Sequence, residues 1–393
     1  KRNTTESYEA IFKGLHWLGI TWDEGPDIGG PYGPYFQSQR NTIYEKYLNL
    51  LDKRGFLYED QGAIRFRSPR KKITVADLVC GNIEFDLSNP ITHPDMTIRR
   101  PDGSWIFHFV NVIDDIEMQI SHVIRGEDHL SNTPKHIELY HALDAVPPLF
   151  AHIPLILNKE GKKLSKRDGG ASLDLYIEKG YAPEAVANYL CLLGWSPKDN
   201  REFFTLEEII QKFELSQINR RNAVFDTDKC YWLQGQHTQK MPLSRYRELA
   251  LPYIQRAGIN YPSLDELDKV LEIVKEKVRL FSDIPSWIRC FFDENFEIEP
   301  EAQQKVLSQP GTSDRLKALR QALAASPVWQ LETIEATFKN LASQKSEKTG
   351  NYIHPARVAV SGRTVGPSLY HMLQILGQEK TLARLQKAEA LAS

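Results

Sequence analysis

Apolar positions recur along this chain with two different periods, and the period changes from region to region. In residues 1–22 apolar side chains return at helical spacing, which predicts a helix that ends at Gly19. A second helix with the same spacing is predicted from Tyr44 to Gly55. The segment between them, residues 25–35, is rich in Gly and Pro and predicts an ordered loop without regular structure.

Residues 56–106 carry short segments in which apolar and polar side chains alternate, such as Ile64-Arg65-Phe66-Arg67 and Met96-Thr97-Ile98-Arg99. Such segments predict strands and hairpins. From Phe107 to Asn158 helical and strand patterns take turns, which is typical of a parallel sheet. Within this region Val123-Ile124 predicts a buried strand that ends in a polar loop and leads into a helix.

After residue 167 the helical period dominates. Two capping boxes are predicted, Thr205-Leu206-Glu207-Glu208 and Ser263-Leu264-Asp265-Glu266, each at the start of a helix. Further helices are predicted over residues 183–195, 316–323, 331–341 and 369–376. No internal repeat is present. The pattern therefore predicts an α/β region followed by an all-α region.

Composition adds limits to this outline. A chain of 393 residues implies two or more domains, and 41% hydrophobic with 25% charged residues is ordinary for a globular protein. No apolar run approaches the length of a membrane span, and the first six residues show no signal-peptide pattern. The cysteines, Cys80, Cys191, Cys230 and Cys290, form no CxxC pair, which argues against a disulfide framework and against a zinc site.

The net charge of −2 does not by itself indicate a nucleic-acid binder. Locally, however, Lys and Arg cluster at residues 53–54, 65–72, 159–167 and 220–221. A protein with a neutral total can still present a basic track to phosphates. Taken one at a time, most of these clusters are interpreted as ordinary charged surface that keeps the protein soluble.

The basic segment Lys163-Leu164-Ser165-Lys166-Arg167 follows the apolar run at residues 153–157. Concentrated positive charge on a short loop suits the triphosphate of ATP, where charge builds on the leaving pyrophosphate. A solvated basic turn is an equally good interpretation of these residues alone.

A second charged segment, Arg125-Gly126-Glu127-Asp128-His129, follows the predicted strand at Val123-Ile124. Ligands of open α/β sheets bind at the carboxyl ends of strands, so charge at this place favours function. The planar guanidinium of Arg125 suits a carboxylate. The alternative is a salt bridge from Arg125 to Glu127 or Asp128.

These two segments resemble a known family. Residues 163–167 resemble the KMSKS signature of class I aminoacyl-tRNA synthetases. The segments 111–115 and 123–135 resemble the glutamyl/glutaminyl subgroup, as do Trp22-Asp23-Glu24-Gly25-Pro26 and the run from Gly29 to Arg40. The predicted helical second half resembles the bacterial-type glutamyl-tRNA synthetases, because glutaminyl enzymes usually carry β-barrels there.

The resemblance implies a Rossmann-like α/β nucleotide-binding catalytic domain with a connective insertion, followed by all-α stem-contact and anticodon-binding domains. It places the catalytic domain at residues 1–56 and 107–158, and the acceptor-binding insertion at 57–106. The KMSKS loop and the stem-contact domain would occupy residues 159–242, and the anticodon-binding domain residues 243–393. The insertion is shorter than is usual in the family and has no zinc-binding cysteine cluster.

The activity that the resemblance implies is glutamate–tRNA ligation, with ATP, L-glutamate and tRNA(Glu) as substrates and Mg²⁺ sharing the phosphate charge. Lys166 and Lys163 are then expected to contact ATP, and Ser165 to shape the catalytic loop. The resemblance places glutamate near Arg125, Asn111, Asp128, His129 and Phe107. Phe107 stands where the family usually has a tyrosine, which removes a hydroxyl from this position.

Two further positions carry expectations. Asp114-Asp115 invites a metal interpretation, but holding the following helix is favoured, so no metal site is expected. Arg357, in the segment from His354 to Gly362, resembles an arginine that reads the last anticodon base in some members. An arginine that contacts a base edge through two hydrogen bonds discriminates well between bases.

The second signature of the family, the HIGH motif, is not found before Lys163. We therefore expect that a βα unit of roughly 30 residues is missing from the nucleotide-binding fold. Two hypotheses stay open: an enzyme whose sequence is incomplete, or a non-catalytic tRNA-binding fragment or descendant. A version that also charges tRNA(Gln) with glutamate is a further alternative. A monomer in the bacterial cytoplasm is expected, and an organelle is left open.

Overall fold

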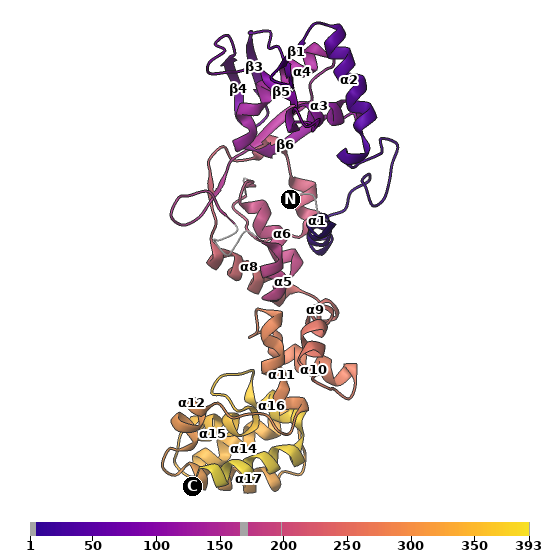
Figure 1. The fold of residues 1–393 in the computed structure, drawn as a ribbon. Helices are drawn as coiled ribbons and strands as arrows, with labels where there is room; N and C mark the ends of the chain where they lie inside the picture. The colour runs from indigo at the N-terminus through magenta and orange to yellow at the C-terminus, as the bar shows by residue number, and fades with distance from the viewer. Residues whose placement is uncertain (1–4, 166–171, 198, 393) are drawn as a thin grey trace. The chain divides into compact units, whose positions relative to one another are not determined.

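The computed structural model describes residues 5–165, 172–197 and 199–392. The chain divides into two compact units (Figure 1). The first takes its described residues from 1–172 and 187–227, and the second from 173–186 and 228–393. Helix α6 (Pro183–Leu192) contributes residues to both.

The first unit is built on a mixed four-stranded sheet of order β4-β3-β7-β6. Strand β3 (Lys72–Asp77) pairs antiparallel with β4 (Gly81–Asp86) and parallel with β7 (Leu149–Ile153). Strand β6 (His122–Gly126) pairs parallel with β7, with Arg125 opposite His152. The expected α/β fold with parallel strands is confirmed. The register between β6 and β7 places Arg125 and His152 side by side.

The first unit contains further strands and helices besides this sheet. A second, antiparallel sheet has the order β1-β2-β5, and two short strands, β8 and β9, pair in parallel. Their bounds are β1 (Leu57–Asp60), β2 (Ala63–Phe66), β5 (Met96–Arg99), β8 (Ile156–Leu157) and β9 (Ala223–Val224). The helices are α1 (Thr5–Trp17), α2 (Asn41–Lys53), α3 (Phe107–Glu117), α4 (Thr133–Ala142) and α7 (Leu206–Lys212). Figure 1 shows α2, α3 and α4 gathered around the strands.

The largest apolar core of the first unit joins three of its helices to the strands. Residues from α2, α3 and α4 bury their apolar faces against the inner faces of the strands, among them Leu51, Phe66, Phe109, Val112 and Leu139, all fully buried. Each such side chain contributes roughly 1.5–3 kcal/mol by leaving water. This core fixes the strand ends that carry the charged segments.

Two predictions about local structure are wrong in part. The strand at Val123-Ile124 was predicted to be buried, but β6 is the last strand in the order of its sheet among the described residues, and Ile124 is 47% exposed. Thr205 and Glu208 form the predicted capping box, whereas at Ser263 only half of the second box forms: its hydroxyl accepts from the backbone of Glu266. No reciprocal bond back to Ser263 accompanies it within the described part of the chain.

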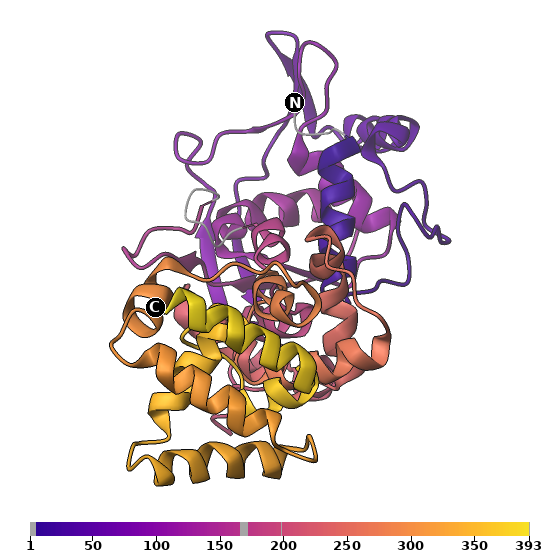
Figure 2. The same ribbon diagram turned by 90° about the horizontal axis from the view of Figure 1, so that it is seen from below.

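The second unit is helical in its described residues and has one large apolar core. Its helices are α5 (Leu173–Glu178), α8 (Thr227–Lys240), α9 (Leu243–Arg256), α10 (Leu264–Lys275), α11 (Ile284–Phe292), α12 (Pro300–Ala302), α13 (Thr312–Ala324), α14 (Leu331–Gln344), α15 (Gly350–Ser361), α16 (Leu369–Leu376) and α17 (Gln378–Leu391). The last helix packs along α13 and α15 (Figure 2). Gly362 directly follows α15, and its φ of +73° and close approach to the carbonyl of Glu297 exclude a side chain.

No helix among the described residues is long and apolar enough to cross a membrane.

Candidate active site

Arg125 lies at the carboxyl end of β6, and its guanidinium is fixed by neutral acceptors. Nε donates to Nε2 of His152 over 3.1 Å, and Nη2 donates to Oγ1 of Thr133 over 2.7 Å. A longer bond of 3.4 Å reaches the carbonyl of His129. No carboxylate lies within ion-pair distance of Arg125 among the residues that the structure describes, so the expected alternative, a salt bridge to Glu127 or Asp128, does not form.

This arrangement leaves a half-buried positive charge without a counterion in contact. Burial lowers the pKa of Arg125, although the nearby Asp115 opposes the shift. An arginine remains protonated despite such a shift, because its reference pKa is above 12. A guanidinium that is oriented but not neutralised is suited to an incoming carboxylate.

Three histidines and Phe107 form an aromatic cluster next to Arg125. Nδ1 of His108 lies 3.0 Å from Nε2 of His136, and the ring of Phe107 packs against His108, His129 and His136. Burial lowers the pKa of His136 to about 3 and also lowers that of His108. The rings of His108 and His136 are therefore neutral at pH 7, and the positive charges of Arg125 and Lys135 both act on them.

Phe107 and His129, both predicted to lie near glutamate, are brought together by this cluster, with ring centroids 6.2 Å apart. Phe107 is 47% exposed, so its ring presents an apolar surface to the site. His129 is hydrogen-bonded to Asn132 over 3.3 Å.

Asn111 and Asp115 lie one turn apart on α3. Nδ2 of Asn111 donates to Oδ2 of Asp115 over 3.4 Å, and the hydroxyl of Tyr140 donates to the same oxygen over 3.1 Å. Burial raises the pKa of Asp115 to about 6, with the hydrogen bond from Tyr140 opposing and the charge of Asp114 adding to the shift. This carboxyl is thus partly protonated near pH 6.

Asp115 makes a testable contribution to stability. Because its folded pKa lies above the unfolded value, the folded state binds more protons between pH 4 and 6, and stability falls as the pH rises through that window. Relative to the wild type, the variant Asp115→Asn is therefore expected to gain roughly 2 kcal/mol in the free energy of unfolding between pH 4 and pH 7. Urea unfolding at both pH values measures this, with Asp52→Asn on an exposed position of α2 as the control. If the free energies of unfolding of Asp115→Asn and wild type differed by the same amount at both pH values, the raised pKa of Asp115 would be contradicted.

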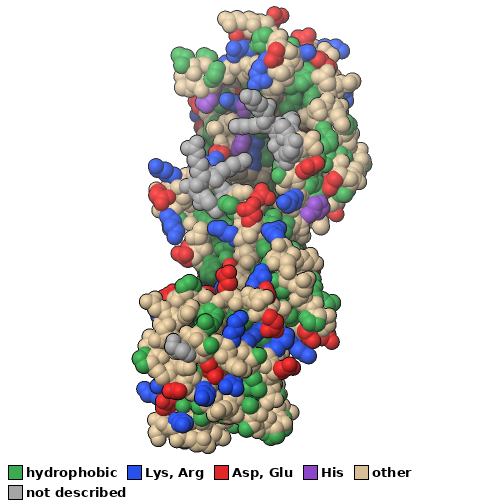
Figure 3. All heavy atoms as spheres, turned by 60° about the horizontal axis from the view of Figure 1, so that its bottom comes forward, with side chains coloured by type: hydrophobic (Ala, Val, Ile, Leu, Met, Phe, Trp, Pro, Cys, Tyr) green, Lys and Arg blue, Asp and Glu red, His purple; other side chains and the backbone are tan. Residues whose placement is uncertain are grey.

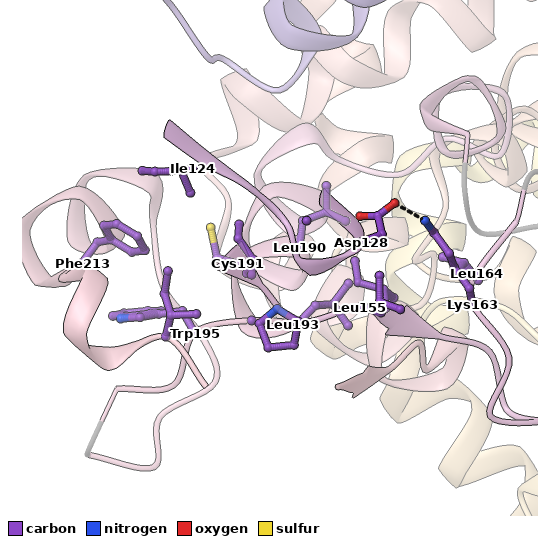
Figure 4. A pocket seen from close by; sticks show the side chains of 16 residues that line it. Ile124, Asp128, Leu155, Lys163, Leu164, Leu190, Cys191, Leu193, Trp195 and Phe213 are labelled. Atoms are coloured by element: carbon purple, nitrogen blue, oxygen red, sulfur yellow. Dashed lines mark hydrogen bonds and ion pairs between the residues drawn. The ribbon is translucent and has the colours of Figure 1, made fainter. Parts of the chain in front are cut away.

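Lys163 and Leu164 lie beside a mainly apolar pocket of about 510 Å³ (Figure 4). Nζ of Lys163 forms an ion pair with Oδ2 of Asp128 over 2.6 Å at one end of this pocket. Leu155, Leu190, Cys191, Leu193 and Trp195 line its apolar wall. The pair joins two residues that were predicted to contact different substrates, Lys163 for ATP and Asp128 for glutamate.

Both members of this ion pair are accessible, with 59% of the Lys163 side chain and 42% of the Asp128 side chain exposed. The hydrogen bond from Lys163 lowers the pKa of Asp128. An exposed pair contributes little to stability, so Lys163 can exchange Asp128 for a phosphate at small cost. Ser165 is exposed beside it, and Lys166 lies outside the described residues.

Asp114 has a structural role. It accepts hydrogen bonds from Nε of Arg40 over 2.7 Å, from the hydroxyl of Tyr44 over 2.8 Å and from Gln37 over 2.9 Å. Arg40 is only 1% exposed and also donates to the carbonyl of Pro34 over 2.7 Å. The predicted Gly- and Pro-rich loop is thus anchored to α3, and no group of three or more potential ligands for a metal ion exists in the part of the chain that the structure describes.

In the second unit, Arg357 projects from α15 and is half-buried. Its Nη1 donates to the carbonyl of Pro367 over 2.6 Å, and a side chain at Gly366 would collide with the same nitrogen. Burial lowers the pKa of Arg357. Lys, Arg, Asp and Glu are interspersed over the face of this unit seen in the lower half of Figure 3.

Sequence reasoning missed Asp77, Thr133, His136 and His152. Each comes to the site through the pairing of strands or the packing of α4 on the sheet, which no local pattern specifies. The sequence did contain one signal. Asp77 and His152 each stand within a strand-like segment of apolar residues, and a polar group that is buried there must find a hydrogen-bond partner.

The mixed sheet with a charged segment at the end of β6, followed by a helical unit, fits a class I aminoacyl-tRNA synthetase, and the family comparison shows that class. Residues 1–63 and 59–232 match the family described as tRNA synthetases class I (E and Q), catalytic domain. Residues 245–389 match the family described as anticodon binding domain. The chain belongs to the glutamyl and glutaminyl family of class I tRNA synthetases.

Several curated relatives are similar to nearly the whole chain. A protein of Akkermansia muciniphila named glutamate--tRNA ligase is 48% identical over 386 residues, covering 98% of this chain and 88% of the relative. One of Methylacidiphilum infernorum with the same name is 48% identical over 392 residues, covering 98% and 87%. The crystal structure of a glutamate tRNA ligase from Elizabethkingia meningosepticum in complex with its amino acid superposes with a TM-score of 0.85 at 30% identity, covering 99% of this chain and 90% of that one.

Proposed function

We propose that this protein is an ATP-dependent glutamate–tRNA ligase. A carboxylate of glutamate attacks the α-phosphate of ATP, pyrophosphate leaves, and the resulting glutamyl-adenylate passes its glutamyl group to the 3′-terminal ribose of tRNA(Glu) with loss of AMP. The observation that carries this proposal is the oriented, uncompensated guanidinium of Arg125 at the strand end. The names of relatives that are 48% identical to the chain support it.

Each predicted site residue has a part in this reaction. Arg125 receives the side-chain carboxylate of glutamate, while Asn111, Asp128, His129 and Phe107 shape the pocket around the amino acid. Lys163 exchanges its ion pair with Asp128 for the phosphates of ATP, together with Lys166, and Ser165 shapes their loop. Mg²⁺ enters with the nucleotide and shares its charge. The protein is expected to need no nucleophile of its own, because positioning and charge stabilisation suffice for this class of transfer.

The two halves of the chain divide recognition between them. We assign residues 57–106 to the acceptor end of the tRNA, residues 159–242 to its stem and residues 243–393 to the anticodon. Action as a monomer in the bacterial cytoplasm completes the proposal, and the bacterial-type relatives support the cellular setting.

The proposal is tested by ATP–pyrophosphate exchange in the presence of tRNA, with glutamate, glutamine and aspartate compared as amino acids. We expect exchange with glutamate and a loss of at least about 10²-fold with glutamine, since an uncharged amide forms no ion pair with Arg125. Equal exchange with glutamate and glutamine would contradict it.

Arg357 offers a separate test of tRNA selection. Replacing it with glutamine is expected to raise KM for tRNA(Glu) by about 10- to 100-fold, the range for losing one bidentate base contact. KM for glutamate should not change, because the substitution lies in the other unit. Charging of tRNA variants with a changed last anticodon base measures this. Arg320→Ala, which removes an ion pair with Glu389 in the same unit, is the control for general weakening. A KM for tRNA like that of wild type would contradict the base-reading role.

A further inference from the structure

The contacts of Arg125 decide where the proton of His152 lies. Nε of Arg125 points at Nε2 of His152 over 3.1 Å. Oγ1 of Thr133 lies 3.0 Å from the same ring nitrogen and accepts from Nη2 of Arg125, so the three side chains close a ring. Guanidinium N–H groups only donate, and therefore Nε2 of His152 must accept.

The other ring nitrogen of His152 faces Asp77. Nδ1 donates to Oδ2 of Asp77 over 2.6 Å, and both side chains are fully buried. Oδ1 of Asp77 accepts the backbone N–H groups of Val79 and Cys80 over 2.9 and 2.8 Å. The carboxylate is thus fixed by donors that belong to the backbone, and it leaves His152 one neutral tautomer, with the proton on Nδ1.

The pKa shifts agree with this placement of the proton. Burial lowers the pKa of His152, although the hydrogen bond with Asp77 opposes it, so the ring is neutral at pH 7. Burial acts to raise the pKa of Asp77, but the backbone of Cys80, the ring of His152 and the backbone of Val79 hold it below its ordinary value.

We propose that Asp77 and His152 are positioning residues for the amino-acid substrate: Asp77 fixes the tautomer of His152, and His152 holds the guanidinium of Arg125 in the orientation that receives a carboxylate. This inference rests on the proposed function of Arg125. A neutral acceptor orients the guanidinium without cancelling its charge, whereas a carboxylate in its place would compete with the substrate for the same cation.

The variant Asp77→Asn tests this with little change of shape. Its amide oxygen must stay on the backbone N–H groups of Val79 and Cys80, because these can only donate. Its NH₂ group then faces Nδ1 of His152 and drives the ring to the other tautomer, as an Asp to Asn change does in a catalytic triad. Nε2–H of His152 then opposes Nε–H of Arg125, and glutamate affinity is expected to fall by about 10- to 100-fold.

The variant His152→Gln separates positioning from general damage. A glutamine oxygen can accept from Arg125 without help from Asp77. In the His152→Gln background, Asp77→Asn should therefore lower the affinity for glutamate far less than it does in the wild type. Such coupling in a double-mutant cycle would not arise if Asp77 had only a structural role. Asp95→Asn is the matched control, because that carboxylate is also held by several donors, Tyr58, Ser68 and Arg70.

The experiment combines calorimetric titration of the full chain with L-glutamate and ¹⁵N NMR of its histidine rings. We expect wild-type His152 to carry its proton on Nδ1 and the Asp77→Asn variant to carry it on Nε2. A wild-type proton on Nε2, an unchanged glutamate affinity in Asp77→Asn, or an equal cost of Asp77→Asn in both backgrounds would overturn the positioning role. Wild-type protein that binds no glutamate would instead refute the proposed function, and the ring tautomer would still decide the role of Asp77.

Discussion

Replacing Arg125 with alanine is expected to lower glutamate-dependent ATP–pyrophosphate exchange by about 10²–10³-fold, the effect of removing a charge-assisted contact to the substrate and leaving its carboxylate unpaired. The physical reason lies in the partners of Arg125. Its charge is held by His152 and Thr133, which are neutral, so it is available to the substrate.

Arg125→Lys should recover little of this loss. An ammonium cannot donate to His152 and Thr133 in the fixed directions that the planar guanidinium uses, and it forms no bidentate contact. The kinetic measurement is kcat/KM for glutamate at saturating ATP, together with KM for ATP, which should change little. Arg201→Ala, at an exposed ion pair with Glu208 in the same unit, is the control. Exchange by Arg125→Ala within threefold or so of wild type would contradict the assignment of Arg125.

The second large effect is on stability. Arg40→Ala is expected to lower the free energy of unfolding of the first unit by roughly 3–5 kcal/mol, because it leaves Asp114 without its cation in a largely buried place. The exposed fractions are 1% for the Arg40 side chain and 13% for that of Asp114. Arg40 also closes the loop between Gly25 and Tyr35 through the carbonyl of Pro34.

A double variant tests whether the orphaned charge causes the loss. Arg40→Met with Asp114→Asn removes both charges and keeps most of the volume, and it should be more stable than Arg40→Ala. Urea unfolding followed by hydrogen exchange measures both variants, and exchange in α10 and α14 of the second unit serves as an internal control. If Arg40→Ala lowered the free energy of unfolding by less than about 1 kcal/mol, the salt bridge between Arg40 and Asp114 would behave like an exposed one, and this prediction would be contradicted.

Much of the helical structure could be predicted from the sequence because its cause is local. The helix predicted after Ser263 is α10, and its Leu267, Val270, Leu271 and Val274 are completely buried. The segments 331–341 and 369–376 likewise lie within α14 and α16. Periodicity states which face of a helix leaves water, whatever it packs against.

The sheet was less predictable because strand order is set by contacts between distant segments. Val123-Ile124 has the composition of a buried strand, yet β6 pairs on one side only among the described residues. The charged segments after the strands could be recognised as candidate sites. Their partners could not, since Asp77 and His152 meet Arg125 only after β3 and β6 have both paired with β7.

Asp114 illustrates the same limit. Two adjacent carboxylates suggest a metal, and sequence alone does not reveal Arg40, which is 74 positions away and pairs with Asp114 over 2.7 Å. The neighbour Asp115 faces Tyr140 instead. Adjacent positions on a helix point in different directions, so the two carboxylates serve two separate networks.

The most direct measurement for this account is the charging of purified tRNA(Glu) and tRNA(Gln) with labelled glutamate, ATP and Mg²⁺, by wild type and Arg125→Ala. We predict an acid-stable, alkali-labile glutamyl ester on tRNA(Glu) that requires ATP and is lost in the variant. Charging of tRNA(Gln) as well would extend the tRNA set and leave the chemistry unchanged. Folded wild-type protein that binds tRNA yet forms neither glutamyl-adenylate nor glutamyl-tRNA would contradict the account.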